Sequence, residues 1–363
     1  MYIKRIKLTN FRNYKDLELN FDKHTNILYG ANAQGKTNLV EAVYLCAVGR
    51  SPRTTKDREM INASADFAHI TVETVKREGD IKIDIIISRT LKKTIKINGV
   101  PILKMGELMG NINCVFFAPD ELKLIKESPQ DRRRFMDIDI SQMSKSYFYL
   151  LQRYEQVLAQ RNKLIKNTRD YNVLKDTLPI YDVQLADTGS KIVISRIKFI
   201  EKLKKNADET NRYLTDDKEN LELEYTGIVG NSIQEIKAIL LKEYEKNYEK
   251  DFALGYTSIG PHRDDIKILV KGIDVRSFGS QGQQRTAALS LKLAELEIFK
   301  TEIGEAPVLL LDDVLSELDS ERQKKLLQRI KNIQTILTCT HFDFADKNEQ
   351  KQFKVQDGHI KNS

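Results

Sequence analysis

The spacing of apolar residues changes twice along the chain. Short alternating or fully apolar runs fill residues 1–125 and 251–363, whereas residues 126–250 contain few glycines and repeat apolar side chains at three- and four-residue steps. Alternation predicts strands, and the longer steps predict helices. We therefore expect an α/β domain made from both ends of the chain, with a mostly helical second domain inserted between them at 126–250.

The apolar runs also predict individual strands. Residues 69–75, 81–87 and 93–97 alternate or are rich in β-branched side chains, and Asn98-Gly99, a strong hairpin signal, closes the group. This pattern predicts an antiparallel meander. Further strands, including fully apolar runs typical of a sheet buried on both faces, are expected at 2–8, 17–21, 26–29, 113–117, 221–225, 266–270, 308–311 and 335–339. Together the runs indicate a mixed sheet beside the meander.

Residues 30–38 read Gly-Ala-Asn-Ala-Gln-Gly-Lys-Thr-Asn and stand between the run at 26–29 and an expected helix at 38–45. They match the phosphate-binding loop, whose glycines let backbone N–H groups point inward while the helix N-terminus adds partial positive charge. Lys36 is expected to reach the β- and γ-phosphates, and Thr37 to bind Mg2+. The predicted ATP-binding residues of this loop are Gly30, Ala31, Asn32, Ala33, Gln34, Gly35, Lys36, Thr37 and Asn38.

Two acidic residues, Asp312 and Asp313, directly follow four consecutive aliphatic residues. Acids at the carboxyl end of a buried parallel strand need a cation or hydrogen bonds, and ligands bind at that end of open α/β sheets. We expect Asp312 to hold magnesium with Thr37, and Asp313 to orient or polarise the attacking water. Taken alone, the pair could equally cap a turn, but the phosphate loop favours the catalytic interpretation, in which Lys36 takes part.

The segment Ser280-Gln281-Gly282-Gln283 precedes an expected helix at 286–299. Ser280 and Gln283 have the spacing of a capping box, which is an ordinary helix start. The exposed N–H groups of such a start also form an anion site. The two interpretations are compatible.

Composition narrows the class of protein. The chain has 363 residues, 40% hydrophobic and 31% charged, with a net charge of +7. No run approaches the ~20 apolar residues of a membrane span, and no long apolar region follows the N-terminus, so we expect a cytoplasmic protein without membrane contact. Cys46, Cys114 and Cys339 are scattered, without metal-ligand spacing. The positive charge favours polyanions such as nucleic acid, but only weakly.

The order of these motifs resembles ABC-type ATPases, and their sequences resemble the RecF family of bacterial recombination mediators. The matching segments lie at residues 9–14 (Thr-Asn-Phe-Arg-Asn-Tyr), 119–122, 133–135, 260–265 (Gly-Pro-His-Arg-Asp-Asp), 279–285 and 311–319. The resemblance spans essentially the whole chain. It implies an ABC-type ATPase head in which two protomers sandwich two ATP molecules.

The resemblance also implies a function. An ATP-driven homodimer would clamp single-stranded, gapped or junction DNA without reading its sequence. It would act with RecO and RecR to promote RecA loading in DNA repair, replication, recombination and the SOS response. Hydrolysis would be weak and DNA-stimulated, and it would end the clamped state.

Further site residues follow from the resemblance. In trans, one protomer would contact its partner's nucleotide through Ser280, Gly282, Gln283 and Asp319. Arg12 would lie near the α-phosphate, Arg53 and Thr54 near the adenine, and His341 would sense the γ-phosphate. The acid after Asp312 is Asp313, where ABC transporters usually have glutamate. The usual glutamine after the strand at 113–117 is not evident, so that part of the magnesium shell stays open.

Two other functions are compatible with a phosphate loop: the ATPase subunit of a membrane transporter, and a small-molecule kinase. Residues 9–14 and 260–265 argue against the first, and the serine-glycine-glutamine segment argues against the second. The run Arg132–Arg134 is interpreted either as a solvated helix start paired with Asp131 and Asp137 or as DNA contacts. Residues 262–264 are expected to form either a buried structural network at the junction of the two domains or a nucleotide contact.

Overall fold

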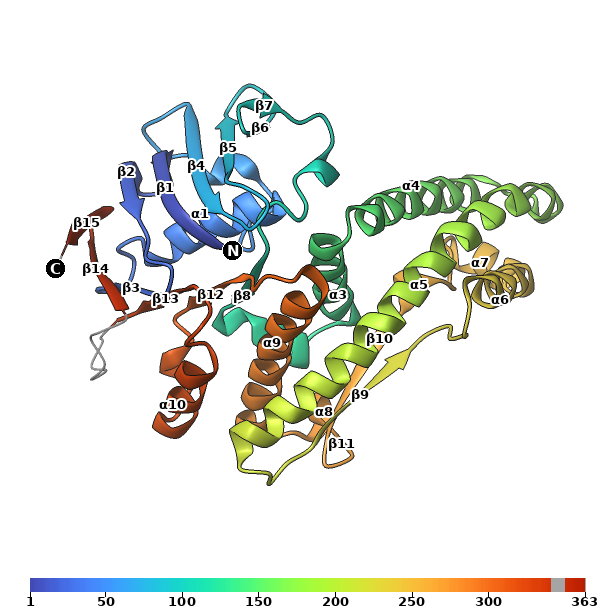
Figure 1. The fold of residues 1–363 in the computed structure, drawn as a ribbon. Helices are drawn as coiled ribbons and strands as arrows, with labels where there is room; N and C mark the ends of the chain where they lie inside the picture. Colours follow the sequence, from blue (N-terminus) through green and yellow to red (C-terminus); the bar gives the residue numbers. More distant parts are fainter. Residues whose placement is uncertain (341–349, 363) are drawn as a thin grey trace.

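The computed structural model describes residues 1–340 and 350–362, which form two lobes joined side by side (Figure 1). The first lobe has two sheets with a helix between them. The second lobe has the longest helices and a small third sheet. Short 3-10 turns connect several elements, at Asp57–Met60, Met105–Glu107, Pro119–Leu122, Pro261–Arg263 and Leu315–Glu317.

The central sheet of the first lobe pairs five strands in parallel and one antiparallel strand at its edge. In spatial order its strands are β15 (His359–Asn362), β14 (Gln350–Gln356), β3 (Thr25–Tyr29), β13 (Thr335–Cys339), β12 (Val308–Asp312) and β8 (Cys114–Phe117). Every residue of β12 is buried. Its side chains divide between two hydrophobic cores, Leu310 on one face and Leu309 on the other. A sheet covered on both faces explains why this strand is a continuous aliphatic run.

The second sheet of the first lobe is the predicted meander, antiparallel throughout. Its order is β2 (Tyr14–Asn20), β1 (Tyr2–Phe11), β4 (Phe67–Val75), β5 (Ile81–Ser88), β6 (Thr94–Ile97) and β7 (Val100–Pro101). Helix α1 (Lys36–Val48) shares one hydrophobic core with both sheets and is buried on nearly all sides. The helix that carries the phosphate loop is therefore fixed between two sheets.

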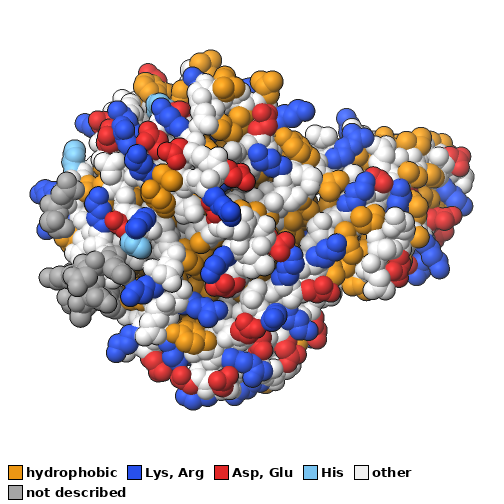
Figure 2. Space-filling view, in the orientation of Figure 1, with side chains coloured by type: hydrophobic (Ala, Val, Ile, Leu, Met, Phe, Trp, Pro, Cys, Tyr) orange, Lys and Arg blue, Asp and Glu red, His pale blue; other side chains and the backbone are white. Residues whose placement is uncertain are grey.

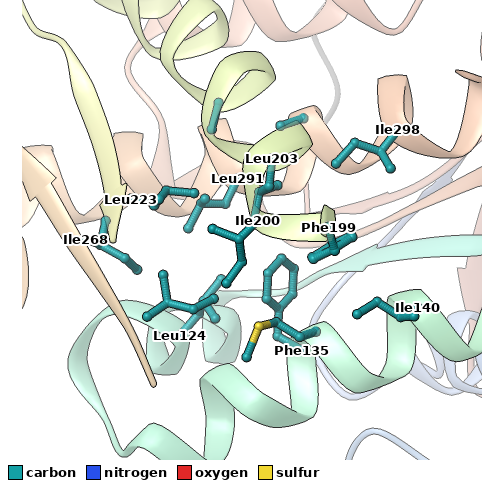
Figure 3. Packing of buried hydrophobic residues seen from close by; sticks show 14 of the residues in the cluster. Leu124, Phe135, Ile140, Phe199, Ile200, Leu203, Leu223, Ile268, Leu291 and Ile298 are labelled. Carbon is teal, nitrogen blue, oxygen red and sulfur yellow. The ribbon is translucent and has the colours of Figure 1, made fainter. Parts of the chain in front are cut away.

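The second lobe is built around α5 (Tyr171–Thr215), a helix of 45 residues that runs along α4, α6 and α9 (Figure 1). Its other helices are α2 (Lys123–Lys126), α3 (Pro129–Met143), α4 (Lys145–Asn167), α6 (Ile233–Lys246) and α7 (Tyr248–Leu254). The stripe formed by Leu185, Ile192 and Phe199 is buried, as its spacing predicts. Figure 3 shows Phe199, Ile200 and Leu203 of α5 packed among side chains of α3, α9 and the third sheet.

The third sheet crosses the boundary expected at residue 250. β9 (Leu221–Thr226) pairs with β10 (Asp265–Val270), which pairs with β11 (Ile273–Asp274). The short helix α8 (Val275–Phe278) follows. Since strands from both sides of residue 250 share one sheet, we propose that the second lobe extends through α8 and that α9 (Gln281–Ile303) leads the chain back to the first lobe.

Several elements are longer than the apolar runs predict. β1 continues to Phe11 and β2 begins at Tyr14, so only Arg12 and Asn13 form the turn. α1 covers residues 36–48 instead of 38–45, and α9 covers 281–303 instead of 286–299. Backbone pairing and end caps set these limits, and apolar spacing does not report them. Within the described ranges, no helix combines the length and apolar character needed to cross a membrane.

Candidate nucleotide site

The loop between β3 and α1 has a backbone that requires glycine at two positions. Gly35 has a φ of +116°, and a Cβ there would lie 2.7 Å from the side-chain nitrogen Nδ2 of Asn13. Gly30 has a φ of +148°, and its Cβ would lie 2.4 Å from the carbonyl oxygen of Val355. Helix α1 begins directly after the loop, at Lys36. The positive end of a buried helix therefore faces the loop, which is the geometry of an anion site.

Lys36 is folded back onto this loop. Its Nζ donates to the carbonyl oxygens of Gly30 at 2.6 Å and Ala31 at 2.8 Å. Burial lowers the pKa of Lys36, and the nearby carboxylates of Asp313 and Asp312 partly oppose this shift. An ammonium held by neutral carbonyls beside a helix N-terminus is suited to exchange them for phosphate oxygens.

Thr37 and Asp312 meet although 275 residues separate them. The Thr37 hydroxyl donates to Oδ1 of Asp312 at 2.9 Å, and the Thr338 hydroxyl of β13 donates to the same oxygen at 2.7 Å. Burial raises the pKa of Asp312, while these two hydrogen bonds favour its ionised form. A hydroxyl beside a carboxylate is the oxygen pair that Mg2+ uses next to bound phosphates.

Asp313 occupies a left-handed backbone conformation, with φ at +54°. Its N–H donates to the Thr338 hydroxyl at 2.9 Å. Its Oδ1 is buried and has no hydrogen-bond partner among the described residues. A buried carboxylate oxygen without a partner is unfavourable unless a ligand supplies one. The residues present therefore fit a nucleotide with its metal ion and attacking water.

Arg12 and Arg53 converge on one buried acid, Glu41 of α1, which is 1% exposed. Arg12 donates to both carboxylate oxygens, at 2.9 and 2.7 Å, and Arg53 donates to one at 3.4 Å. The Ser51 hydroxyl donates to Glu41 at 2.5 Å. Arg53 also donates to the side chain of Asn38 at 2.9 Å. Glu41 and Asn38 thus orient two guanidinium groups at the start of α1, and their contact with the α-phosphate and base stays a prediction.

Two more predicted residues have different outcomes. The Thr54 hydroxyl donates to Glu59 at 2.5 Å, and its N–H donates to the Ser51 hydroxyl at 3.2 Å, so it helps to order the loop that carries Arg53. His341 lies outside the described residues, two positions after the last residue of β13. Its predicted sensing role stays a prediction.

A second group of predicted residues lies at the starts of α9 and α10 (Ser320–Arg329). Ser280 and Gln283 form the predicted capping box, with hydrogen bonds of 3.2 and 3.0 Å. Asp319 caps α10 by accepting from the Arg322 N–H at 2.9 Å. Ser280, Gly282 and Asp319 line one groove of about 280 Å³. The four residues expected to act in trans thus share one surface.

This surface is separate from the loop within one chain. Figure 1 shows the start of α9 beside α8, away from β3 and the start of α1. Ser280 and Gly282 are exposed. The chain brings together Lys36, Thr37, Asp312 and Asp313 in one place, and Ser280, Gly282, Gln283 and Asp319 in another.

Sequence patterns missed several residues that shape the loop. Asn13 donates to the Gln34 carbonyl at 2.9 Å and accepts from Asn38 at 2.8 Å. The turn between β14 and β15 also packs here, since the Gly358 N–H donates to the Gln34 carbonyl at 3.1 Å. Thr338 and Glu41 complete the set. Polar residues within otherwise apolar elements, as at Glu41 and Thr338, are the one signal that could have revealed them.

The arginine run is not a solvated helix start paired with Asp131 and Asp137. Arg132 is 2% exposed and binds both oxygens of Asp265, at 2.6 and 3.0 Å. Arg133 donates to the carbonyl of Asp264 at 2.7 Å. These contacts join α3 to β10, so Arg132 is buried away from DNA phosphates, and only Arg134 is exposed.

Residues 261–264 belong to a buried polar network within the second lobe, where α4 and α5 meet the segment before β10. Arg196 of α5 donates to Asp264 at 2.9 Å and to the Pro261 carbonyl at 2.6 Å. The Tyr154 hydroxyl and the His262 ring nitrogen Nδ1 lie 2.7 Å apart. Burial raises the pKa of Asp264 to about 6 and lowers that of His262 to about 4. The segment is structural, and it stands apart from the phosphate loop.

The sequence matches a known family over nearly its full length. The model of the RecF/RecN/SMC N terminal domain matches residues 2–361. The chain is 45% identical over 364 residues to the DNA replication and repair protein RecF of Clostridium tetani, covering 99% of each chain. It is 47% identical over 363 residues to that of Clostridium kluyveri, also covering 99% of each.

Solved structures give the same relationship in three dimensions. The fold is similar to the recombination mediator protein RecF-ATP in the RecFOR pathway, with a TM-score of 0.91, 36% identity and coverage of 100% of this chain and 97% of that chain. It is also similar to the SmcHead bound to the C-winged helix domain of ScpA, with a TM-score of 0.60, 18% identity and coverage of 99% and 96%. The second likeness concerns the fold alone. Both agree with the predicted ATPase head of mixed sheets and helices.

Proposed function

The chain belongs to the RecF family of DNA replication and repair proteins, and on that premise we propose that it binds ATP and Mg2+ and closes as an ATP-dependent homodimer on DNA. Membership in this family argues against the two alternatives, a transporter ATPase subunit and a small-molecule kinase. One observation carries the proposal: Lys36 and Asp312 of the loop half are buried and hydrogen-bonded within the chain, while Ser280 and Gly282 of the other half are exposed and lie apart from them.

Within one chain, the residues around the loop are suited to hold the nucleotide. Lys36 and the N-terminus of α1 would bind the phosphates, and Arg12 and Arg53 would hold the α-phosphate and base side. Thr37 and Asp312 would hold the magnesium ion, which supplies charge neutralisation at the β- and γ-phosphates. Asp313 would accept a proton from, or orient, the attacking water through its unpartnered Oδ1. None of these proposed contacts requires a second chain.

The second copy would complete the site. Its Ser280 hydroxyl and the N–H groups at the start of α9 would meet the γ-phosphate, with Asp319 at the interface. ATP would bridge the protomers only in the closed dimer, so it would shift the population toward that state. Hydrolysis would remove the bridging γ-phosphate and release the dimer. The ATPase activity would then act as a switch that ends the closed state.

DNA is the proposed polyanion because the net charge is +7 and the relatives are DNA repair proteins. The face in Figure 2 carries Lys and Arg interspersed with Asp and Glu, without one large basic patch. Backbone contacts from separate cations suit recognition without sequence preference. We propose gapped or junction DNA as the ligand, with RecO and RecR as partners and RecA loading as the outcome.

The test is DNA retention on gapped duplexes by wild type and Lys36→Met, with and without ATP and magnesium, over a range of salt concentrations. The proposal predicts ATP-dependent retention that falls steeply with salt and is lost in Lys36→Met. Lys23→Met, an exposed lysine in the turn before β3, is the matched control and should behave as wild type. Retention that ignores both ATP and Lys36 would contradict the proposal.

A further inference from the structure

A residue of the second lobe holds the Gln283 side chain of the Ser280 half. Nε2 of Gln283 donates to Oε1 of Glu219 at 2.9 Å, across 64 residues of sequence. Oε1 of Gln283 accepts from the Ser280 N–H at 3.0 Å. An amide carries its donor and its acceptor on different atoms, so a carboxylate at Nε2 determines that the oxygen faces Ser280. Glu219 thus fixes the orientation of the capping glutamine.

Glu219 lies in the turn between α5 and β9, residues 216–220, and this turn is anchored to α9. The Glu219 carbonyl accepts from the side-chain nitrogen of Asn211 at 2.9 Å. Asn211 is fully buried, and its side-chain oxygen accepts from Ser290 of α9 at 3.2 Å. Asp216 of the turn accepts from Lys325 of α10 at 2.6 Å. The α5–β9 turn therefore contacts both helices that begin at the groove.

This arrangement affects what the Ser280 hydroxyl can do. The hydroxyl oxygen accepts from the Gln283 N–H at 3.2 Å. A hydroxyl has a single hydrogen to donate, and using its oxygen as a helix cap leaves that hydrogen for an outside acceptor. Glu219 and Ser280 line the same groove of about 280 Å³. By fixing Gln283, Glu219 therefore keeps the Ser280 hydroxyl at the surface with its hydrogen free to be donated.

We propose that Glu219 is a positioning residue for ATP-dependent association: through Gln283 it keeps the Ser280 hydroxyl oriented toward the γ-phosphate presented by a second copy of the chain. This inference rests on the proposed homodimer. Glu219 contacts the α9 half and not the residues around Lys36 and Asp312. Its loss should weaken association of ATP-bound chains and leave ATP binding by the single chain unchanged.

The experiment compares wild type with Glu219→Ala, Glu219→Gln and the control Glu224→Ala. Glu224 is an exposed acid of β9 whose ion pair with Lys267 spans 3.7 Å. The measurements are affinity for a fluorescent ATP analogue, ATP-dependent dimerisation by sedimentation, and the melting temperature. We expect Glu219→Ala to weaken dimerisation about tenfold, the order of magnitude of one side-chain hydrogen bond. Glu219→Gln should restore dimerisation because its side-chain oxygen accepts the same hydrogen bond.

The outcomes separate this inference from the proposal on which it rests. A wild-type chain that binds ATP but stays monomeric would contradict the homodimer, and the inference with it. If wild type and Glu219→Ala dimerise equally, only the role of Glu219 is overturned. An equal loss in Glu219→Gln, or a parallel loss of ATP affinity in Glu219→Ala, would also overturn it, because a purely structural or charge effect would account for the change.

Discussion

The two halves of the candidate site differ in how completely one chain forms them. Around the loop, Lys36 is 6% exposed and Asp312 is 7% exposed, and both have partners from other elements of the same lobe. At the start of α9, Ser280, Gln281 and Gly282 are exposed, and their cap serves the helix itself. The difference teaches that holding a nucleotide and completing the site are separable tasks. In the proposed mechanism, the first would need one chain, and the second would need the exposed half of another copy.

The two halves are nevertheless linked within the chain. Arg285 of α9 forms an ion pair with Glu317 and also donates to its carbonyl at 3.4 Å. Glu317 belongs to the short turn that follows Asp313. The link connects the half proposed to hold one nucleotide to the half proposed to meet another. Substitutions in one half should therefore leave the other half largely intact, with a small effect transmitted through the Arg285–Glu317 pair.

The largest expected effect comes from the loop half. Lys36→Met should weaken ATP binding about 100-fold, since a charge-assisted hydrogen bond to phosphate contributes about 3 kcal/mol. Association should disappear with it, because the second half then has nothing to meet. Titration with a fluorescent ATP analogue measures the first effect and light scattering the second. Normal affinity in Lys36→Met would show that the loop is not the phosphate site.

Next in size is a change to the acid pair. Asp313→Asn removes the proposed base but keeps the shape, so hydrolysis should fall about 100-fold while ATP binding is retained. The ATP-bound dimer should then persist, as seen by sedimentation after long incubation. Asp16→Asn, an exposed acid of β2, is the control. Loss of ATP binding in Asp313→Asn would mean that the roles assigned to Asp312 and Asp313 are reversed.

A smaller effect concerns the buried network around His262 in the second lobe, outside both halves. Burial lowers the pKa of His262 to about 4, so the folded state binds fewer protons than the unfolded state between about pH 4 and pH 6.5. Its contribution therefore destabilises the fold as the pH falls through that window, by about 2 kcal/mol at pH 5.

Asp264 acts in the opposite direction. Its pKa is raised to about 6, so the folded state binds the extra proton and gains relative stability as the pH falls. Wild type should show little net change, whereas His262→Gln should become more stable relative to wild type toward pH 5. Urea unfolding at pH 7 and pH 5 measures this difference. A constant difference at both values would show that His262 does not titrate as its burial implies.

The smallest effect tests the link itself. Arg285→Ala breaks an ion pair whose side chains are 41% and 34% exposed, and such pairs contribute about 1 kcal/mol or less. Dimerisation should weaken by no more than about fivefold, with ATP affinity unchanged. A double-mutant cycle with Glu317→Ala isolates the pair. A change in ATP affinity would mean that the two halves are not separable.

The sequence predicted those parts of the site that are contiguous or follow a periodic run. The loop at residues 30–38, the acids after β12 and the capping box of Ser280 all combine a local pattern with a local physical reason. The central parallel strands could be predicted for the same reason, because a sheet buried on both faces requires aliphatic runs. These elements also positioned the loop and the acids at one end of the sheet.

Other features depend on contacts that no local pattern reports. Arg132 stands in a run of three arginines, which is typical of a solvated face, yet it binds Asp265 from 133 residues away. Glu41 lies in an apolar helix and receives Arg12 and Arg53 from two loops. The pairing of β9 with β10 joins segments on both sides of the expected domain boundary. Each of these contacts is evident only in the folded chain, because the fold determines which distant residues meet.

The most direct test of the central claim asks whether the two halves meet between molecules. Asn32 of the loop and Gln281 at the start of α9 are exposed, and the three native cysteines are buried, so cysteines introduced at these two positions are the reactive ones. Asn32→Cys and Gln281→Cys chains are mixed with a short thiol cross-linker, with and without ATP and Mg2+. The account predicts a covalent heterodimer that forms with ATP and is absent when the Asn32→Cys chain also carries Lys36→Met. Nucleotide binding without any cross-link, or a cross-link equally abundant without ATP, would contradict it.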